Sequence, residues 1–371
     1  MPNDSVAVLL NANAKQVSDR IQGAISHVVP PEDIFLSRSP RDAKAIARTV
    51  LDRGFGTVFI GGGDGTFVGF VNEIFDFLER PDRPGPVEGV GRRPFQAPAP
   101  SVARRPNRPA GGAVVPRFGM LKLGTGNAVA GLLGASPVRG GGILDDLLRA
   151  RSGEIPGVYE LDLLETEGRC CPFAGFGIDA AIINDYAALK RRLAGGPLGR
   201  WATGGAGYAA SISAKTAPHY LAGRGHAEVE VVNEGGPAVR LGRGGRLLGA
   251  YAPGEILYRG PCNVVAGSTV PNFGFHFKFF PFAGKERGKM QLRVSRVPAL
   301  TVLRHLGTVW NGSYANEDDC FDFLCDRVSV RFDRPMPFQI GGDAEGYREK
   351  IRFGIADRSV EMVSFNKSLR N

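Results

Sequence analysis

The chain has 371 residues, 43% of them hydrophobic, which is enough apolar material for two globular domains of ordinary size. No apolar run approaches the ~20 residues that span a bilayer, and residues 6–10 are too short for a signal peptide and follow an acidic residue, so a cytoplasmic protein is expected. The net charge of +9 favours anionic partners, namely nucleotide, nucleic acid or an acidic membrane surface, without choosing among them. The five cysteines lack metal-ligand spacing and are expected to be reduced and structural.

The first 60 residues alternate between strand-like and helix-like patterns. Short β-branched and apolar runs predict strands at residues 6–10, 34–36 and 57–60, and helical spacing predicts helices at 17–28 and 39–51. Ser39 and Pro40 have the features of an N-cap followed by proline at the first helical position. This alternation predicts an α/β domain with a parallel sheet, in which ligands bind beyond the carboxyl ends of the strands, where Asn11 lies.

A glycine-rich turn follows the third predicted strand and consists of Gly61, Gly62, Gly63, Asp64, Gly65 and Thr66. Glycines let the backbone turn sharply and leave N–H groups uncovered, so a phosphate can approach closely. The helical spacing after Thr66 adds a helix N-terminus to this phosphate cradle. Neither the P-loop pattern nor the dinucleotide fingerprint matches. An ordinary tight turn is the alternative, although a carboxylate and a hydroxyl among glycines can serve a Mg²⁺–nucleotide complex.

Residues 80–117 are dominated by Pro, Arg, Gly and Ala, and they interrupt the periodic patterns. Such a stretch cannot bury enough apolar surface to offset its ordering entropy, so a flexible insertion is predicted. It would serve either as an electrostatic tether to anionic lipid or nucleic acid, or simply as a solvated surface loop.

A second glycine turn follows a predicted strand at 118–123 and precedes an apolar helical stretch at 129–133. It consists of Gly124, Thr125, Gly126 and Asn127. Two such turns after two parallel strands can face one nucleotide from two sides, and the pair in this order is a much stronger signal than either turn alone.

The region from 158 to 345 has a different pattern, with short alternating runs, many turn residues and few helices. This pattern is typical of an antiparallel β-sandwich. Alternate aromatics at 273–279 would line either an acyl-chain pocket or the sandwich core, with His276 on the opposite face. The cations at 190–192 and the pair Arg200 and Trp201 suit either docking on anionic lipid or a plain solvated helix face.

Together the two glycine turns resemble the diacylglycerol kinase catalytic family, which includes lipid, sphingoid-base and ceramide kinases. The run 11–14 resembles the first-strand motif of that family, 160–163 and 174–180 resemble the motifs that open its second domain, and 342–346 resemble its Asp-Gly-Glu motif. The resemblance implies an α/β domain at 1–155 of the diacylglycerol kinase and NAD kinase type, an all-β sandwich at 156–345 and an active site between them. The segment 346–371 would return toward the first domain.

The resemblance also implies roles for individual residues, with ATP and Mg²⁺ as cofactors. Asp343 would accept the proton of the acceptor hydroxyl, and Glu345 would either assist it or contact the nucleotide. Asp64, Asp162 and Asp179 would serve the metal and its water network. The nucleotide would be held by Asn11, Gly61, Gly62, Gly63, Asp64, Gly65, Thr66, Gly124, Thr125, Gly126 and Asn127. A polar turn is the alternative for Asp343 and Glu345, and a structural cap is the alternative for Asp162 and Asp179.

Several positions depart from the family pattern. Residues 67–69 replace the Leu-Asn-Glu that commonly follows the first turn in bacterial members, and Asn72 and Glu73 come three residues later. Lys122 replaces a frequent proline, and Ala344 replaces the glycine of the Asp-Gly-Glu motif. These changes leave nucleotide binding expected, while the geometry of the metal and the base is less firmly implied.

The leading hypothesis is an ATP-dependent lipid kinase that converts diacylglycerol to phosphatidic acid, followed by a sphingoid-base or ceramide kinase. An NAD kinase-like enzyme is the second hypothesis, but the flanking residues expected around 267–269 are missing. A nucleotide-binding protein without catalysis is the third. The expected partners are a lipid substrate at the membrane surface and a peripheral anionic membrane, with a homodimer left open and no nucleic acid.

Overall fold

The computed structural model describes residues 5–14, 16–79, 115–124, 126–155, 157–193, 225–273, 277–314 and 316–369. Most of the predicted insertion at 80–117 lies outside these ranges, as do Thr125, Arg200, Trp201 and His276. The side chains at 190–192, on which the lipid-docking interpretation depended, also fall outside the description.

The first domain is built on a six-stranded sheet among the described residues, in the order β2-β1-β3-β4-β18-β5. Strands β1 to β4 and β18 are parallel, and β5 pairs with β18 in the antiparallel direction. The predicted α/β domain with a mostly parallel sheet is therefore confirmed. The bounds are β1 Val6–Asn11, β2 Ile34–Ser37, β3 Thr57–Gly62, β4 Arg117–Lys122, β5 Gly157–Leu161 and β18 Val360–Ser364.

Helices cover both faces of this sheet because successive strand residues point to opposite sides. Ala7 and Leu9 of β1 pack in the same core as the helices α2, α3 and α4, whereas Val8 and Leu10 pack with α1 and α5. The bounds are α1 Asp19–Ser26, α2 Pro40–Arg53, α3 Asp64–Glu79, α4 Ala128–Leu132 and α5 Gly142–Arg151. Short 3-10 helices lie at Pro31–Asp33, Arg139–Gly141, Arg243–Gly245 and Lys367–Leu369.

The start of α2 shows why local signals located these helices well. The Ser39 hydroxyl accepts a hydrogen bond from the Asp42 N–H at 3.2 Å, and the Asp42 carboxylate accepts one from the Ser39 N–H at 3.0 Å. This capping box, with proline at the first helical position, fixes where the helix begins. Gly54 ends the helix in the left-handed conformation, with a φ of 66°.

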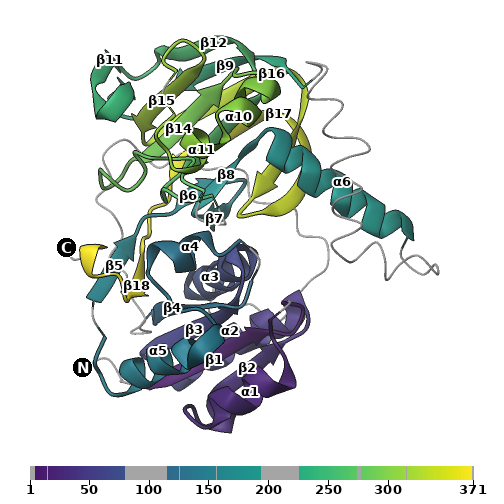
Figure 1. Ribbon diagram of the computed structural model, residues 1–371, viewed down its shortest axis with the longest axis vertical. Coiled ribbons are helices and arrows are strands. Elements are labelled where there is room, and N and C mark those ends of the chain that lie inside the picture. Colours follow the sequence, from purple (N-terminus) through teal and green to yellow (C-terminus); the bar gives the residue numbers. More distant parts are fainter. Residues whose placement is uncertain are drawn as a thin grey trace.

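The second domain is antiparallel, as predicted, and twelve of the described strands form one continuous, strongly curved sheet rather than two separate ones (Figure 1). Its main path runs β11-β10-β15-β14-β13-β8-β16-β17-β6-β7, and β9 joins β16 to β12. Helices α6 (Ile178–Leu193), α10 (Ala299–Arg304) and α11 (Leu306–Trp310) accompany it. The strands are β6 Leu164–Thr166, β7 Arg169–Cys171, β8 Phe173–Phe176, β9 Ala227–Asn233, β10 Ala238–Leu241, β11 Leu247–Tyr251, β12 Ile256–Cys262, β13 Val264–Ser268, β14 Met290–Ser295, β15 Cys320–Cys325, β16 Arg327–Ile340 and β17 Asp343–Ile355.

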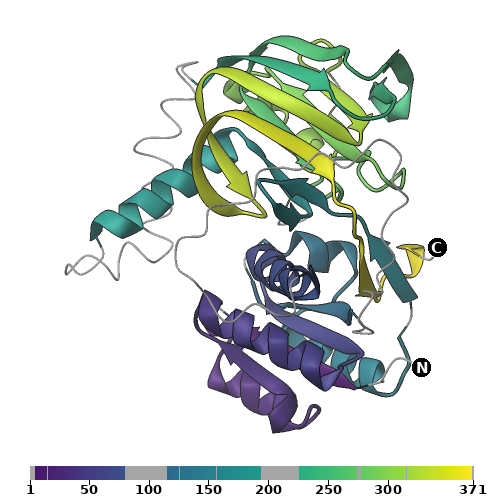
Figure 2. The same ribbon diagram turned by 180° about the vertical axis from the view of Figure 1, so that it is seen from behind.

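The chain crosses between the domains at positions that differ from the predicted boundaries. Strand β5 lies in the first sheet, although the boundary at 155 and 156 assigned it to the second domain. Strand β17 runs in the second sheet as far as Ile355, beyond the boundary at 345. The chain then returns to the first sheet as β18, between β4 and β5 (Figure 2). Strands β5 and β18 pair although they are about 200 residues apart in the sequence. Such pairing leaves no trace in a local pattern, because a short strand shows a similar alternation of apolar and polar residues whichever sheet it joins.

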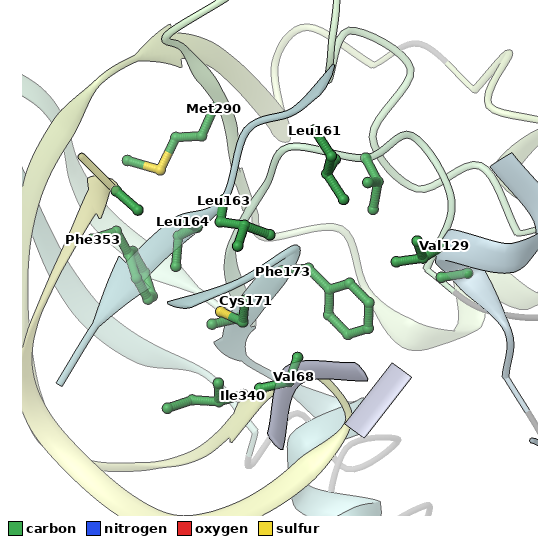
Figure 3. Packing of buried hydrophobic residues seen from close by; sticks show 14 of the residues in the cluster. Val68, Val129, Leu161, Leu163, Leu164, Cys171, Phe173, Met290, Ile340 and Phe353 are labelled. Carbon is green, nitrogen blue, oxygen red and sulfur yellow. The ribbon is translucent and has the colours of Figure 1, made fainter. Parts of the chain in front are cut away.

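One hydrophobic core runs through both domains. Val68 of α3 and Val129 of α4 belong to the same buried cluster as Phe173 and Ile340 of the second sheet (Figure 3). Because such a core is densely packed, it holds the two domains in a defined relative position. The five cysteines are all free, and burial raises the pKa of Cys171 to about 12. Across the described ranges, no helix is long and apolar enough to cross a membrane.

Candidate active site

The two glycine turns lie against each other at the carboxyl edge of the first sheet. They follow β3 and β4, which are parallel neighbours with Gly62 opposite Lys122. A Cβ atom built on Gly124 would lie 2.3 Å from the Cα atom of Gly63, so only glycine permits this approach. The two turns therefore form one continuous, backbone-lined surface.

Asp64 ties the first turn to the helix that follows the second. One of its carboxylate oxygens accepts a hydrogen bond from the Ala128 N–H at 2.9 Å, and the other accepts one from the Val129 N–H at 3.0 Å. The side chain is buried, and this burial raises the pKa of the Asp64 carboxyl even though the hydrogen bonds oppose the rise. In this structure Asp64 acts as a cap on α4, and its assignment to nucleotide and metal stays a prediction.

Asn11 joins the end of β1 to the same place. Its Nδ2 donates a hydrogen bond to the Thr66 hydroxyl oxygen at 2.8 Å, and its Oδ1 accepts one from the Asn13 N–H at 2.9 Å. A Cβ atom on Gly62 would lie 2.5 Å from the Thr66 hydroxyl oxygen, so the Thr66 side chain lies directly over the turn. Three loops from three strands thus converge at one edge of the sheet.

Asn127 occupies the left-handed conformation, with a φ of 51°, at the start of α4. Its Nδ2 donates to the Gly124 carbonyl at 2.8 Å, which closes the second turn. Its Oδ1 is buried and has no hydrogen-bond partner among the described residues. Buried polar atoms are usually paired, so an orphaned acceptor in this turn is a feature of a site that takes a ligand. Gly126 lies in the same turn, next to the undescribed Thr125.

Asp343 reaches this edge from the second domain. A Cβ atom built on Gly65 would lie 2.9 Å from Oδ2 and 3.0 Å from Oδ1 of Asp343, so the carboxylate sits against the first glycine turn. The preceding residues Gly341 and Gly342 have φ values of 57° and 89°, which only glycine adopts readily. Their N–H groups donate to the Phe173 carbonyl at 2.9 Å and to Gln339 Oε1 at 2.8 Å. This anchored turn between β16 and β17 places Asp343 against the first domain.

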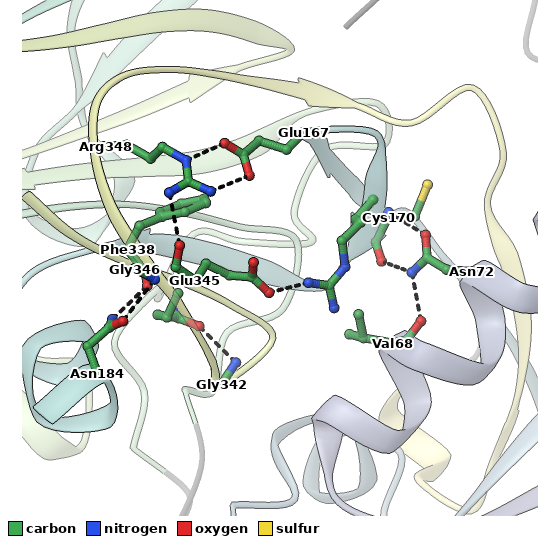
Figure 4. A network of polar contacts seen from close by, with 12 residues as sticks. Val68, Asn72, Glu167, Cys170, Asn184, Phe338, Gly342, Glu345, Gly346 and Arg348 are labelled. Carbon is green, nitrogen blue, oxygen red and sulfur yellow. Dashed lines mark hydrogen bonds and ion pairs between the residues drawn. The ribbon is translucent and has the colours of Figure 1, made fainter. Parts of the chain in front are cut away.

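A polar network lies around Glu345, near the start of β17 (Figure 4). Arg169 of β7 forms an ion pair with Glu345, two residues beyond Asp343. Burial raises the pKa of the Asp343 carboxyl, the positive charge of Arg169 lowers it, and the negative charge of Glu345 raises it again. The net effect is a raised pKa, although part of the Asp343 residue is exposed to solvent.

Further contacts hold the backbone on either side of Glu345. Arg348 pairs with Glu167 through two contacts of 2.5 and 3.0 Å, and it donates to the Glu345 carbonyl at 2.9 Å. Asn184 of α6 accepts a hydrogen bond from the Gly346 N–H at 2.8 Å and donates one to the Phe338 carbonyl at 2.9 Å. The start of β17 is therefore fixed from two sides, and its acidic side chains are held in place.

Asp162 and Asp179 occupy different surroundings. Asp162 accepts hydrogen bonds from Arg287 at 2.9 Å and from the Gly288 N–H at 2.8 Å, which holds a loop of the second domain. Asp179 lies in the first turn of α6, where burial raises its pKa to about 6 and its Oδ2 has no partner among the described residues. Within the described part of the chain, no three or more His, Cys, Asp or Glu side chains form a group that could hold a metal ion. The three carboxylates assigned to the metal therefore do not form one ready-made cluster.

Asn72 is a contact that the sequence did not reveal. It extends from α3 to β7 of the second domain, where it donates to the Cys170 carbonyl at 2.7 Å and accepts from the Cys170 N–H at 2.8 Å. The sequence shows that Asn72 lies three residues beyond the position expected from the family motif, but it does not show that Cys170 is its partner. Arg169, Arg348 and Asn184 likewise could not be predicted, since a single polar residue in a strand or helix resembles a solvent-exposed position.

Two glycine turns in contact at the carboxyl edge of a parallel sheet, with a carboxylate of the second domain beside them, are features that suit a kinase. Residues 5–156 match the family model of the diacylglycerol kinase catalytic domain, which confirms the resemblance. The chain thus carries a kinase-family catalytic domain, and its class is that of a phosphotransferase. None of the curated proteins compared with the chain matches it.

Solved structures resemble the whole chain. A proposed diacylglycerol kinase from Bacillus anthracis str. Sterne has a TM-score of 0.60 at 13% sequence identity, and the alignment covers 99% of each chain. A diacylglycerol kinase from the same organism has a TM-score of 0.56 at 12% identity, covering 99% of this chain and 98% of that one. At such identities the likeness concerns the fold, and it extends over both domains.

Proposed function

We propose that the protein is an ATP-dependent lipid kinase that phosphorylates a hydroxyl group at a membrane surface, with diacylglycerol as the acceptor and phosphatidic acid as the product. One observation carries the proposal: the Asp343 carboxylate of the second domain lies against Gly65 of the first glycine turn. A proton acceptor beside a phosphate cradle is what transfer of a phosphoryl group to an alcohol requires.

The chemistry places few covalent demands on the protein. The acceptor oxygen attacks the γ-phosphorus of ATP, the bond to the β,γ-bridging oxygen breaks, ADP leaves and the hydroxyl proton passes to Asp343. The backbone N–H groups of the two glycine turns hold the phosphates in line for this attack. The Asn127 side chain adds a polar contact from the second turn, and Asn11 orients the Thr66 hydroxyl at the first.

The raised pKa of Asp343 suits a general base, because a more basic carboxylate takes up the acceptor proton more readily. The positive charge of Arg169 opposes this rise in the pKa of Asp343. Glu345, held by Arg169, is a positioning residue in this scheme rather than a second base.

Magnesium fits this site as a companion of the nucleotide. Mg²⁺ is commonly bound by one or two carboxylates together with substrate phosphates, and the described residues contain no cluster that would hold it alone. When bound, it would offset the charge that develops on the transferring phosphoryl group. Of the carboxylates that the resemblance assigns to the metal, Asp179 has an oxygen, Oδ2, without a partner among the described residues, so it is the one that would be available to Mg²⁺ or its water shell.

The test measures phosphate transfer from Mg²⁺–ATP to diacylglycerol vesicles, sphingosine, ceramide and NAD side by side. We expect phosphate in diacylglycerol, and we expect Asp343→Asn to lower kcat by roughly 10²- to 10⁴-fold while ATP still binds. Glu349→Gln, which removes the same charge from an exposed position on the same strand, is the matched control and should retain full activity.

Four outcomes would contradict the proposal or one part of it. Phosphate incorporated only into NAD would indicate a soluble-substrate kinase, and phosphate only in sphingosine or ceramide would change the acceptor. ATP binding without turnover on any acceptor would indicate a nucleotide-binding protein. A near wild-type rate for Asp343→Asn would remove Asp343 from the role of base.

A further inference from the structure

Helices α10 and α11 present an unusual concentration of exposed apolar side chains. The exposed fractions are 54% for Leu300, 48% for Leu306 and 43% for Trp310. Within the described residues only seven large hydrophobic side chains are exposed, and three of them lie in these two short helices. Leu306 and Trp310 are four residues apart in α11 and therefore share one face. Clustered apolar groups of this kind mark a surface that contacts a partner.

The charge around these side chains is positive. Arg304 ends α10 and is exposed, and the exposed Lys278 is fixed beside α11 because its N–H donates to the Trp310 carbonyl at 2.9 Å. Residues 297–316 contain no Asp or Glu. Apolar side chains flanked by an indole ring and cations fit the interface of an anionic bilayer, where chains enter the acyl boundary and cations meet the headgroups.

Packed aromatic rings connect this surface to the strand beside the active site. Trp310 stacks on Phe277 at 5.3 Å between ring centroids, and Phe277 contacts Phe279 at 5.3 Å. Phe279 contacts Phe273 at 5.8 Å, and Phe273 contacts Phe173 of β8 at 4.8 Å. The Phe173 carbonyl accepts the hydrogen bond from Gly341, two residues before Asp343. The exposed helices and the catalytic turn are therefore supported by one continuous set of contacts.

A cavity of about 350 Å³ borders the same helices. Its wall includes Gly312, Ser313 and Tyr314, which follow α11 directly, and the Tyr314 ring lies 5.6 Å from the His305 ring between the two helices. The wall also carries Arg243 and Lys285, whereas its acidic groups are engaged: Asp322 binds Arg293, and Glu317 binds Arg246. These cations extend the positive charge from the helices to the cavity.

We propose that Lys278, Leu300, Arg304, Leu306 and Trp310, together called the α10–α11 surface, dock the protein on an anionic phospholipid bilayer. The two helices lie together on one face of the second domain (Figure 1). The inference rests on the proposed lipid-kinase function, since a kinase that acts on diacylglycerol must contact the bilayer that contains this acceptor. It assigns membrane contact to described helices rather than to the Arg/Pro-rich insertion.

Vesicle binding without ATP or acceptor tests the surface separately from catalysis. The full chain is sedimented with vesicles of about three parts phosphatidylcholine to one part phosphatidylglycerol. We expect Leu306→Glu to weaken binding at least roughly tenfold, because burial of one Leu side chain is lost and a negative charge is added. Leu148→Glu, at a position of similar exposure (52%) in the first domain, is the matched control and should bind like the wild type.

Trp310 supplies a second measurement. The chain has two tryptophans, and Trp201→Phe leaves Trp310 as the single indole reporter. In that background we expect the emission to shift to the blue and lipid-borne quenchers to reduce it when anionic vesicles are added. Urea unfolding of each variant checks that the exposed substitutions leave the fold intact.

The proposal is overturned if Leu306→Glu binds the vesicles like the wild type, or if Trp310 emission does not respond to them. It is also overturned if Leu306→Glu converts a dimer to a monomer while vesicle binding is unchanged, since a second copy of the chain would then cover this surface. Docking with no phosphorylation of any lipid acceptor would uphold the surface and refute the lipid-kinase function. Phosphorylation of diacylglycerol in detergent micelles without binding to vesicles would uphold the lipid-kinase function and refute the docking surface.

Discussion

At the scale of single residues, the charge balance around Asp343 decides how the site depends on pH. Two neighbours act in opposite directions on its carboxyl: the positive charge of Arg169 lowers the pKa and the negative charge of Glu345 raises it. The two are themselves an ion pair, so removal of one partner changes the effect of the other. Arg169 is therefore the residue through which the basicity of Asp343 can be altered without touching it.

Arg169→Met should move the acid limb of the rate profile to higher pH. A general base works only when deprotonated, so kcat/KM falls as the pH drops through the pKa of Asp343. Without Arg169 the charged form loses its stabilisation and the pKa rises further. Rates measured between about pH 5 and pH 9 test this. Arg259→Met, which breaks an exposed pair with Glu230, is the control, and an unchanged or downward-shifted limb for Arg169→Met would contradict the assignment.

Gly65→Ala should reduce turnover, because the added Cβ atom would meet the Asp343 carboxylate at 2.9 Å and displace it. A shift of about 1 Å in a catalytic group can cost on the order of 10²-fold in rate. Gly69→Ala, one turn later in α3, meets open space and should leave kcat unchanged while stabilising the helix by about 0.5–1 kcal/mol. Equal kcat values for the two variants would show that catalysis does not depend on the position of the Asp343 carboxylate beside Gly65.

At the scale of elements, α4 depends on a carboxylate that belongs to α3. Asp64→Asn replaces one acceptor oxygen by an NH₂ group, which cannot accept from Ala128 or Val129. We expect a loss of about 1–3 kcal/mol in unfolding free energy and weaker ATP binding, because the second turn loses its anchor. Urea unfolding and nucleotide titration measure both. Asp145→Asn, on the exposed first turn of α5, should change neither quantity.

Elements with a strong local signal were predictable from the sequence. The helix 39–51 was expected from its cap and proline and is observed at 40–53, and the strand 57–60 is observed at 57–62. In contrast, the aromatic alternation at 273–279 does not produce a strand in its described positions. There Phe273 and Phe279 pack against neighbouring rings instead, since side-chain packing outweighs the backbone preference of so short a run.

The candidate site was predictable only in part, for a similar reason. Each glycine turn could be located because it follows a β-branched strand, and the resemblance placed Asp343 among the site residues. The contact between Gly63 and Gly124, the position of Asp343 over Gly65 and the pair of Arg169 with Glu345 depend on long-range pairing. Such contacts are set by how sheets and domains pack, and nothing in a window of a few residues encodes them.

At the scale of the whole molecule, the first domain is completed by the last strand of the chain. Strand β18 lies between β4 and β5, and its side chains Val360, Met362 and Val363 are buried. The segment 5–156 that matches the family model therefore lacks part of its own sheet. In addition, Asn72 fixes α3 to β7 of the second domain through two hydrogen bonds. The two domains are thus expected to unfold as one unit.

A chain that ends at Ile355 should not retain a folded first domain. Burial of three large side chains of β18 contributes roughly 1.5–3 kcal/mol each, which is comparable with the total stability of about 5–15 kcal/mol of a typical domain. We expect the truncated chain to lose its cooperative thermal transition and its protease resistance, and a synthetic peptide of residues 356–371 to restore both. A chain that ends at Leu369 keeps β18 and serves as the control. If the chain ending at Ile355 melts like the full-length protein, β18 contributes little to the first domain, and residues 5–155 form an independent folding unit.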